Sequence, residues 1–390
     1  MKITPEKARR VLCSLHGFDS LRKGKKGAVE LFDDIPCIQV DPIDPAGRNH
    51  DLTLFSRVED YRREYLSDLL YKENEVFEYY CKMLSIVPMS TYPVFKNKME
   101  KQEKKYEPLF HEYSDVIEYI LDVLEYEPVS SLELKEMGAN EIESWRTTRT
   151  SNRLLRSLWL SGKISIHHRE GRRKYYTLTE NVIPKDLLEC DALSEEEAKK
   201  KIAEMIVNSS KLVSPSKASA QWNSVGGVRE TRKVLSELED EDVVFSLEVD
   251  GWDGDLYALE KDRERWEEPP GLGPSYVRFL APLDPLLWNR ELFASIFGRE
   301  YVWEVYKKKE DRKYGHYCLP ILYDDEYAGL IEPYFDNGTL EVRNFYLFNE
   351  VDEEGFITQF EREINRYMRF LGAEKLEVKT DHPSFSCMSI

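Results

Sequence analysis

The sequence has few features of secreted, membrane or metal-binding proteins. Its six cysteines are scattered and form no C-x-x-C pair, which argues against a zinc site and indicates reduced thiols. No run of about 18 apolar residues occurs, and Met1 to Pro5 lead directly into a charged segment, so we expect neither a membrane span nor a secretory signal. These absences predict a cytoplasmic protein. Its length of 390 residues suggests about two to four domains.

The chain also lacks an overall positive charge, because its formal net charge is -18. This value excludes a protein coated uniformly in positive charge for nucleic acid, but it allows a local patch. From Arg146 to Lys174, nine Lys or Arg residues stand against one acid, Glu170. A positive field is therefore concentrated in this one segment.

Three helices are predicted around the basic segment. Apolar residues at helical spacing predict a helix that begins at Ser114 and buries Ile117, Ile120, Leu121 and Leu124. Pro128 ends this helix, and a capping box of Ser130 and Glu133 begins a second one. A third helix is predicted over residues 141–160, with its core side formed by Leu154, Leu155, Leu158 and Trp159.

The outer side of the third predicted helix is basic, with an arginine stripe at Arg146, Arg149, Arg153 and Arg156. Guanidinium groups with almost no acidic partners repel each other unless phosphate is present, so DNA contact is favoured over a merely solvated face. Residues 163–169 and 174–178 then predict a hairpin with a basic tip. Its candidate DNA contacts are His167, His168, Arg169, Arg172, Arg173 and Lys174. Three helices and a hairpin predict a winged helix.

The same order of helices and hairpin recurs on both sides. Thr4 and Pro5 begin a helix that carries an apolar stripe of Ala8, Val11, Leu12 and Leu15, and a second helix is predicted before residue 38. Downstream, a capping box of Ser194 and Glu197, a helix over 228–238 and a hairpin over 243–259 follow. After a Pro-rich joint at 267–271, alternating runs at 301–306, 318–323, 327–331 and 339–346 predict a β-rich unit. A helix over 356–371 packs on that unit, and the residues from 379 are expected to form a tail.

A short run from Ile38 to Pro42 displays an amide and a carboxylate. Side chains alternate along an extended backbone, so Gln39 and Asp41 share one face, and Pro42 favours an extended conformation at the residue before it. Such a pair can bind and deprotonate a water molecule if it lies in a cleft. The spacing alone is common in half-buried strands, where a solvated edge is the plainer interpretation.

The residues around this pair form a more specific combination. The triplet Gln39-Val40-Asp41 precedes Arg48-Asn49-His50-Asp51-Leu52 and Phe77-Glu78-Tyr79-Tyr80, and the segments 280–290 and 314–320 belong to the same pattern. Over most of the chain this resembles the winged-helix DNA glycosylases that act on alkylpurines and interstrand crosslinks, whose site is a Gln-apolar-Gln or Gln-apolar-Asp triplet. The resemblance implies an α+β fold of three tandem winged-helix domains, over 1–112, 113–188 and 189–266, and a C-terminal β-barrel-like domain over 267–390.

The resemblance also implies a monofunctional enzyme that releases alkylated purines from double-stranded DNA. Asp41 would be the catalytic base and Gln39 would position the water, while Arg48, His50 and Arg57 would contact DNA. Tyr79, Tyr80 and Lys82 are candidate lesion contacts; Lys82 stands where many family members have a histidine. We expect a monomer that is associated with the nucleoid and needs no metal and no cofactor.

Two other interpretations stay open at this stage. The first is a winged-helix transcription regulator in which the pair is structural, although such regulators usually read palindromic sites as dimers through one recognition helix. The second is a nuclease in which Asp41, Asp44, His50 and Asp51 bind Mg or Mn. A catalytic Schiff base on Lys82 is a less favoured variant of the glycosylase, because a monofunctional enzyme requires no catalytic amine.

Overall fold

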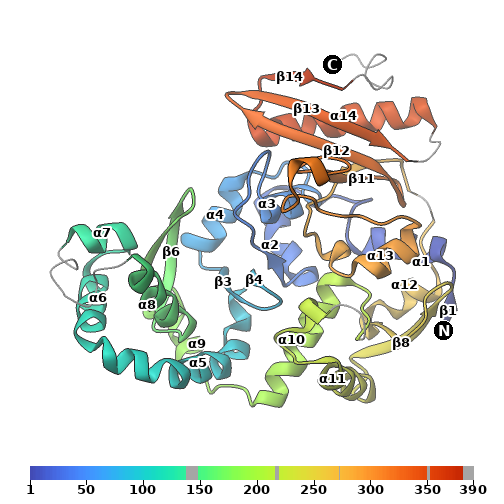
Figure 1. Ribbon diagram of the computed structural model, residues 1–390. Helices are drawn as coiled ribbons and strands as arrows, with labels where there is room; N and C mark the ends of the chain where they lie inside the picture. Colours follow the sequence, from blue (N-terminus) through green and yellow to red (C-terminus); the bar gives the residue numbers. More distant parts are fainter. Residues whose placement is uncertain (138–147, 216–218, 272, 349–351, 381–390) are drawn as a thin grey trace. The chain divides into compact units, whose positions relative to one another are not determined.

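The computed structural model describes residues 1–137, 148–215, 219–271, 273–348 and 352–380 (Figure 1). These residues divide into two compact units. Unit 1 comprises residues 1–66, 80–86 and 202–390, and unit 2 comprises residues 67–79 and 87–201. Among the described residues, no helix combines the length and apolar character needed to cross a membrane. The predicted division into four consecutive domains stays a prediction, because each unit combines segments from several of them.

The N-terminal helices of unit 1 form as their sequence predicts. Helix α1 (Pro5–Leu15) begins after Thr4, whose side chain accepts a hydrogen bond from the backbone of Lys7, and has proline in its first turn. It buries the predicted apolar stripe of Ala8, Val11, Leu12 and Leu15. Helix α2 (Gly24–Asp34) follows, and strand β2 (Ile38–Gln39) comes after it. Strand β2 pairs antiparallel with β4 (Leu84–Pro88), through Ile38 with Ile86 and Gln39 with Ser85.

The third predicted group of helices and hairpin is also present in the structure. Helices α10 (Glu195–Ser210) and α11 (Val228–Asp240) precede a hairpin of β8 (Val244–Val249) and β9 (Leu256–Leu259). The predicted capping box at Ser194 and Glu197 is formed. The N-terminal strand β1 (Lys2–Ile3) pairs parallel with β8, so the first residues of the chain share a sheet with the hairpin of β8 and β9. That pairing joins two segments that the sequence assigns to different domains.

The C-terminal part of unit 1 contains a five-stranded sheet, where the sequence predicted a barrel-like domain. Its order is β10-β11-β12-β13-β14, so β10 and β14 are its edges. The bounds are β10 Val277–Phe279, β11 Leu319–Tyr323, β12 Glu326–Asp336, β13 Thr339–Leu347 and β14 Lys375–Val378. Helix α14 (Glu353–Leu371) covers one face of the sheet (Figure 1), where Phe360 packs against Phe279 and Phe345. Helix α13 (Arg290–Phe297) lies earlier in the chain.

The strand predicted over 301–306 is wrong, because these residues lie in a loop. The carboxylate of Glu304, which is 3% exposed, accepts backbone N–H groups from Tyr314 at 2.8 Å and Lys313 at 3.1 Å. The hydroxyl of Tyr301 donates to Cys318 O at 2.8 Å. Residues 301–306 are therefore held in a loop by side-chain hydrogen bonds, without the ladder of a sheet. Their burial does not alternate, because Tyr301, Glu304 and Val305 are buried, whereas Val302 and Tyr306 are exposed.

Unit 2 contains the predicted basic winged segment. Helices α6 (Ser114–Tyr126), α7 (Ser131–Glu136) and α8 (Thr148–Leu160) precede the hairpin of β6 (Ile164–Glu170) and β7 (Arg173–Leu178), to which β5 (Val129–Ser130) adds a strand. The capping box of Ser130 and Glu133 is formed, and the predicted core residues of α8 are buried. Helix α6 begins at Ser114 with Tyr113 as its N-cap, and it buries Val116, Ile120 and Leu124, so its apolar stripe is slightly rotated from the prediction.

The sequence did not predict helix α5 (Tyr92–Glu112), which is charged along most of its length. Its buried residues are Tyr92, Val94, Phe95, Met99 and Leu109, too widely spaced to give a continuous apolar stripe. The other helices are α3 Asn49–Phe55, α4 Arg63–Tyr71, α9 Lys185–Glu189 and α12 Arg263–Glu267, and strand β3 spans Val76–Tyr80.

Candidate active site and nucleic-acid interface

The Gln39/Asp41 pair lies where an edge of regular structure gives way to a loop. Strand β2 ends at Gln39, and the backbone N–H of Val40 still donates to Leu84 O at 2.8 Å. Asp41 comes just beyond this last bond, so the strand is shorter than the sequence predicts. Both Gln39 and Asp41 are half-buried, whereas Ile38 is completely buried. The pair is therefore held by a fixed backbone and is still open to solvent.

Within the described residues, one oxygen of the Asp41 carboxylate accepts a hydrogen bond and the other accepts none. Oδ1 accepts a hydrogen bond from the backbone N–H of Ile43 at 2.9 Å, which fixes the side chain. Among the described residues, Oδ2 has no hydrogen-bond partner. Burial raises the pKa of Asp41 above the ordinary value, against the effect of the Ile43 N–H, which lowers it. An accessible carboxylate with a raised pKa is suited to accept a proton from water.

The side chain of Lys82 contacts the other member of the pair. Its Nζ donates to Oε1 of Gln39 at 3.0 Å and lies 4.5 Å from the ring centre of Trp288. Lys82 is only 9% exposed, and burial lowers its pKa to about 7. The sequence predicted that Lys82 contacts the lesion, and in the structure its side chain contacts Gln39.

Asn49 is a site residue that the sequence interpretation missed. It is 1% exposed, and its Nδ2 donates to the backbone oxygen of Gln39 at 2.8 Å. Its Oδ1 accepts the N–H of Leu283, also at 2.8 Å. Asn49 thus joins the triplet to the segment 280–290. Its neighbours Arg48 and His50 carry charged or ionisable groups and were predicted to contact DNA. The amide of Asn49 is neutral, and its residue type alone did not predict a role.

The loop after Asp41 is held by residues from the C-terminal sheet and helix. Three consecutive carbonyls accept hydrogen bonds: Pro45 from Phe335 N at 2.8 Å, Ala46 from the Tyr367 hydroxyl, and Gly47 from the Tyr317 hydroxyl at 2.9 Å. Gly47 has φ +109°, and a Cβ there would lie 2.8 Å from the side chain of Leu52. The C-terminal part of the chain therefore sets the path of the loop that leaves the site.

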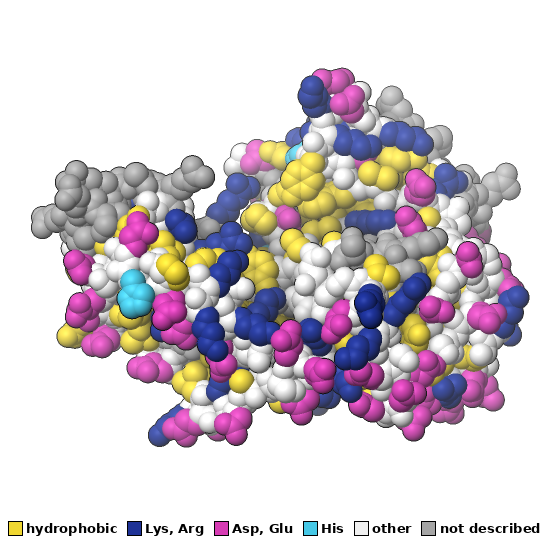
Figure 2. Space-filling view, turned by 60° about the horizontal axis from the view of Figure 1, so that its bottom comes forward, with side chains coloured by type: hydrophobic (Ala, Val, Ile, Leu, Met, Phe, Trp, Pro, Cys, Tyr) yellow, Lys and Arg dark blue, Asp and Glu magenta, His cyan; other side chains and the backbone are white. Residues whose placement is uncertain are grey.

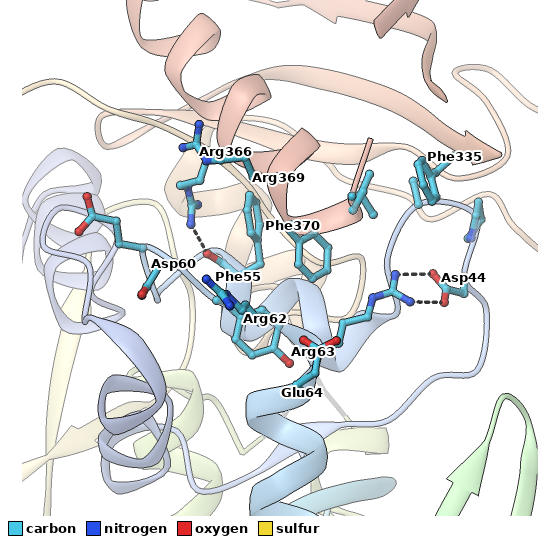
Figure 3. A pocket seen from close by; sticks show the side chains of 16 residues that line it. Asp44, Phe55, Asp60, Arg62, Arg63, Glu64, Phe335, Arg366, Arg369 and Phe370 are labelled. Atoms are coloured by element: carbon cyan, nitrogen blue, oxygen red, sulfur yellow. Dashed lines mark hydrogen bonds and ion pairs between the residues drawn. The ribbon is translucent and has the colours of Figure 1, made fainter. Parts of the chain in front are cut away.

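The same loop also lines a cavity of about 610 Å³, shown in Figure 3. Arg63 donates to both carboxylate oxygens of Asp44, at 3.1 and 3.3 Å, and Arg366, Arg369 and Phe370 reach the cavity from helix α14. Gln39 and Asp41 are absent from its described lining. The cavity is thus distinct from the pair, and the Arg63–Asp44 ion pair anchors the loop from a second side.

Arg57 does not have the predicted role in DNA contact. It is completely buried, and its Nη1 and Nη2 donate to the two carboxylate oxygens of Asp284 at 2.7 and 2.8 Å. Nη2 also contacts Nδ1 of His16 at 3.0 Å, and Nη1 donates to Ser56 and Thr53. A guanidinium without solvent access cannot reach a phosphate, so the prediction for Arg57 is corrected to a structural ion pair.

The other basic residues near the triplet are largely enclosed. Nε of Arg48 donates to Asp51 at 3.0 Å and its side chain is 28% exposed, while His50 is 7% exposed. Asp51 also accepts the hydroxyl of Tyr61 at 2.8 Å. Asp51 is thus paired with Arg48 and Tyr61, and Asp44 is paired with Arg63. The nuclease interpretation would instead require these carboxylates to point together at one metal ion. Among the described residues, no group of three or more His, Cys, Asp or Glu could hold a metal ion.

The two candidate tyrosines occupy different environments. Tyr79 is 1% exposed; its hydroxyl donates to Leu160 O at 2.7 Å and its ring packs against Phe95 and Trp159. A residue fixed in this way inside the core of unit 2 cannot stack on a lesion, so that prediction is wrong. Tyr80 is half-buried, and its proposed contact stays a prediction.

The basic hairpin of unit 2 has exposed and enclosed cations. Arg172 and Arg173 at the turn are exposed, as are Arg153 and Arg156 on α8. Arg169 instead forms an ion pair with Glu78, which is 7% exposed, and so its guanidinium is already occupied. The exposed arginines are the ones available to phosphate groups.

The remaining basic residues of this segment either lie beside aromatic rings or lie outside the described residues. Nζ of Lys174 lies 4.7 Å from the ring centre of Trp159, and His168 stacks on Tyr175 at 4.2 Å, beside His167. Arg146 and the side chain of Arg149 lie outside the described residues. Figure 2 shows Lys and Arg interspersed with Asp and Glu over the face it draws, so positive charge on that face is local.

Two comparisons with known proteins bear on the fold and the family of this chain. The fold is similar to that of Streptomyces sahachiroi DNA glycosylase AlkZ, with a TM-score of 0.67, 15% sequence identity, and coverage of 97% of this chain and 99% of that chain. Because the sequence identity is low, this similarity shows the fold alone. Residues 33–370, which include the triplet, Asn49 and Lys82, match the family model described as DNA glycosylase AlkZ-like. The chain therefore belongs to the AlkZ-like DNA glycosylase family.

Proposed function

We propose that this protein hydrolyses the N-glycosidic bond of N7-alkylated purines in double-stranded DNA, with Asp41 as the general base. The observation that carries the proposal is the Asp41 carboxylate, which is half-buried, fixed through Oδ1 by Ile43 N–H at 2.9 Å, and open at Oδ2. Interstrand crosslinks of the same chemistry are a second substrate class within this proposal. Tyr80 is the tyrosine retained as a candidate lesion contact.

The chemistry of the substrate explains why few groups suffice. An N7-alkylated purine carries positive charge, so its glycosidic bond already has a good leaving group. The protein has to hold a water molecule and stabilise the positive charge that develops on the sugar. Asp41 accepts the water proton and supplies the negative charge, while Gln39 positions the water. General-base assistance of this kind contributes about 10²–10⁴ in rate.

The proposed enzyme is monofunctional and independent of metal. Attack by water releases the free alkylbase and leaves an abasic site, with no covalent enzyme intermediate. Membership of a glycosylase family favours an enzyme over the alternative of a winged-helix regulator. The pairing of Asp44 and Asp51 with arginine side chains supports a reaction that does not use these carboxylates as ligands.

DNA binding is proposed for the winged segments. We assign Arg153, Arg156, Arg172 and Arg173, all exposed in unit 2, to phosphate contacts, with Lys174, His167 and His168 beside them. The three tandem winged helices and the monomeric state belong to the same proposal. The helix-then-hairpin order of α6 to β7 and of α10 to β9 supports it.

The decisive experiment is the substitution Asp41→Asn, which removes the proton acceptor and keeps the shape. Release of 7-methylguanine from alkylated duplex DNA, measured in single turnover, should fall by about 10²–10⁴, while affinity for the duplex stays nearly unchanged. Gln39→Ala should show a smaller loss, because a misplaced water still meets an intact base. Unaltered turnover of Asp41→Asn would refute the mechanism.

The products and the metal dependence provide the controls. Activity should survive excess EDTA, and the abasic strand should break only after heating in alkali. Direct strand scission that is restored by Mg or Mn would point to the nuclease chemistry instead. Tight sequence-dependent binding without base release would point to the regulator.

A further inference from the structure

The contact between Lys82 and Gln39 constrains the chemistry of the proposed site. Lys82 lies in the turn between β3 and β4, and Gln39 lies on β2, which pairs with β4 in the same unit. The backbone on both sides of the contact is thus fixed, and Trp288 covers Nζ at 4.5 Å from its ring centre. A side chain that is 9% exposed has little freedom to turn away.

An ammonium group can only donate hydrogen bonds, whereas the Gln amide has a donor end and an acceptor end. The end of Gln39 that faces Lys82, at 3.0 Å, must therefore be the carbonyl oxygen Oε1. The NH₂ group at the other end of the amide is directed away from Lys82. Turning the amide over would place two donors against each other in a buried position, which is costly.

We propose that Lys82 is a positioning residue that holds Gln39 as a hydrogen-bond donor in the active site, while Asp41 remains the acceptor. The inference rests on the proposed function of the Gln39/Asp41 pair. A water molecule between the two accepts a hydrogen bond from the Gln39 NH₂ group and donates one to Asp41 Oδ2. Its proton is directed at the base and one lone pair stays free for the attack on C1′.

The orientation of Gln39 would be poorly defined without Lys82. The backbone oxygen of Gln39 is held by Asn49 at 2.8 Å, but this bond does not reach the side-chain amide. With the donor lost, the amide could present either end to the substrate. Two acceptors facing the water would compete for its protons and leave its position less defined.

The test is a double-mutant cycle on Lys82 and Gln39, measured as the single-turnover rate of 7-methylguanine release. Lys82→Met keeps the length and apolar stem of the side chain and removes the donor. It should lower the rate about 10–100-fold with little change in DNA affinity. In a Gln39→Ala background the same substitution should cause no further loss, because Lys82 acts through Gln39. Equal losses in both backgrounds would overturn the inference.

A second variant, Gln39→Glu, tests the donor assignment directly. Its carboxylate can pair with Lys82, so the fold is preserved, but it has no NH₂ group. The rate should therefore fall to the level of Gln39→Ala. A rate close to that of the native protein would show that the donor end is unnecessary, and so would overturn the inference.

Lys211 provides a matched control within unit 1. It is 2% exposed and donates to Asp34 O at 2.8 Å and to Asn208 Oδ1 at 3.1 Å. Neither of these partners belongs to the Gln39/Asp41 pair. Lys211→Met should leave the single-turnover rate of the folded protein unchanged. A loss equal to that of Lys82→Met would mean that removing any buried lysine has this effect, and the specific role of Lys82 would fall.

Two further results separate this inference from the proposed function. If Asp41→Asn keeps its activity, the proposed function itself fails. If Asp41→Asn is inactive but the Lys82 and Gln39 effects are additive, only the positioning role fails. Reduction with borohydride during turnover should leave no covalent link between Lys82 and DNA; trapping at Lys82 would identify a nucleophile and overturn the positioning role.

Discussion

Arg57 and the arginines of the β6–β7 turn are the same residue type in opposite settings. Arg57 in unit 1 has no solvent exposure and donates to Asp284, Ser56 and Thr53. Arg172 and Arg173 in unit 2 are exposed at a hairpin turn. All three were predicted to bind DNA, Arg57 from the family resemblance and the other two from the basic tip of the hairpin. Their partners differ, and this difference decides whether a guanidinium stabilises the fold or is available to phosphate.

Lys82 shows a third setting, in which a buried cation has a neutral partner. Its partner is the Gln39 amide oxygen, and the pKa of Lys82 is lowered to about 7 by burial. A carboxylate partner would keep such a group charged across the physiological range, whereas a neutral partner lets it titrate there. The three settings predict three different responses to substitution or to pH.

The largest expected effect is the loss of the buried ion pair. Arg57→Met leaves the Asp284 carboxylate buried without its cation, which typically costs about 3–5 kcal/mol of unfolding free energy. Denaturant unfolding of the purified protein measures this loss. The salt dependence of DNA binding by the folded fraction should be the same as in the native protein.

An exposed ion pair provides the control for this experiment. Lys26 pairs with Glu30 at 3.4 Å with its side chain 88% exposed, so Lys26→Ala should change the unfolding free energy by about 0.5 kcal/mol or less. Equal losses for Arg57→Met and Lys26→Ala would contradict the distinction between buried and exposed cations.

The next effect concerns DNA affinity. Arg172→Ala with Arg173→Ala should weaken binding to damaged and undamaged duplex alike, and should reduce the slope of log affinity against log salt by about 2. The unfolding free energy should stay nearly unchanged, since both side chains are exposed. Titration of a labelled duplex at several salt concentrations measures the slope.

A variant with the same change of charge serves as its control. Lys72 and Lys185 in unit 2 are exposed and already paired with Asp68 and Glu189. Lys72→Ala with Lys185→Ala should change the salt slope less than the wing variant does. If the two double variants behaved alike, the wing would contribute only through net charge.

The smallest effect is the pH dependence of turnover. Lys82 loses its charge as pH rises through about 7, and a neutral amine can accept as well as donate, so the Gln39 amide is no longer held in one orientation. The rate of base release should fall a few-fold above pH 7 in the native protein and stay flat in Lys82→Met. Cys37 and Arg290 also face Lys82, so Cys37→Ser should keep this fall if Lys82 is the titrating group.

Stability should change with pH in the opposite direction. The folded pKa of Lys82 lies below the ordinary value of 10.5, so the unfolded state binds more protons between about pH 7 and that value. The contribution of Lys82 to the unfolding free energy therefore rises with pH across this window. The difference between the native protein and Lys82→Met, measured by denaturant unfolding at several pH values, should show this rise.

Much of the local structure could be predicted from the sequence. The capping boxes at Ser130 and Ser194, the hairpin of β6 and β7, and the stripe of α1 depend on residues close in the chain, so their patterns were sufficient. The strand predicted over 301–306 was wrong because these residues form a loop that is fixed by hydrogen bonds to Glu304, and no described strand pairs with them. Helix α5 was missed because tertiary contacts, more than periodicity, stabilise it.

The sequence by itself determined the family pattern, the Gln39/Asp41 pair and the location of the basic wing, because each is set by residue type and by spacing along the chain. Only the tertiary structure decided which charged groups are enclosed and what they contact. Asp284 lies 227 residues from Arg57, and Lys82 lies 43 residues from Gln39. The energy of a charge depends on its burial and on its nearest partner, and both arise from folding contacts that no local pattern records.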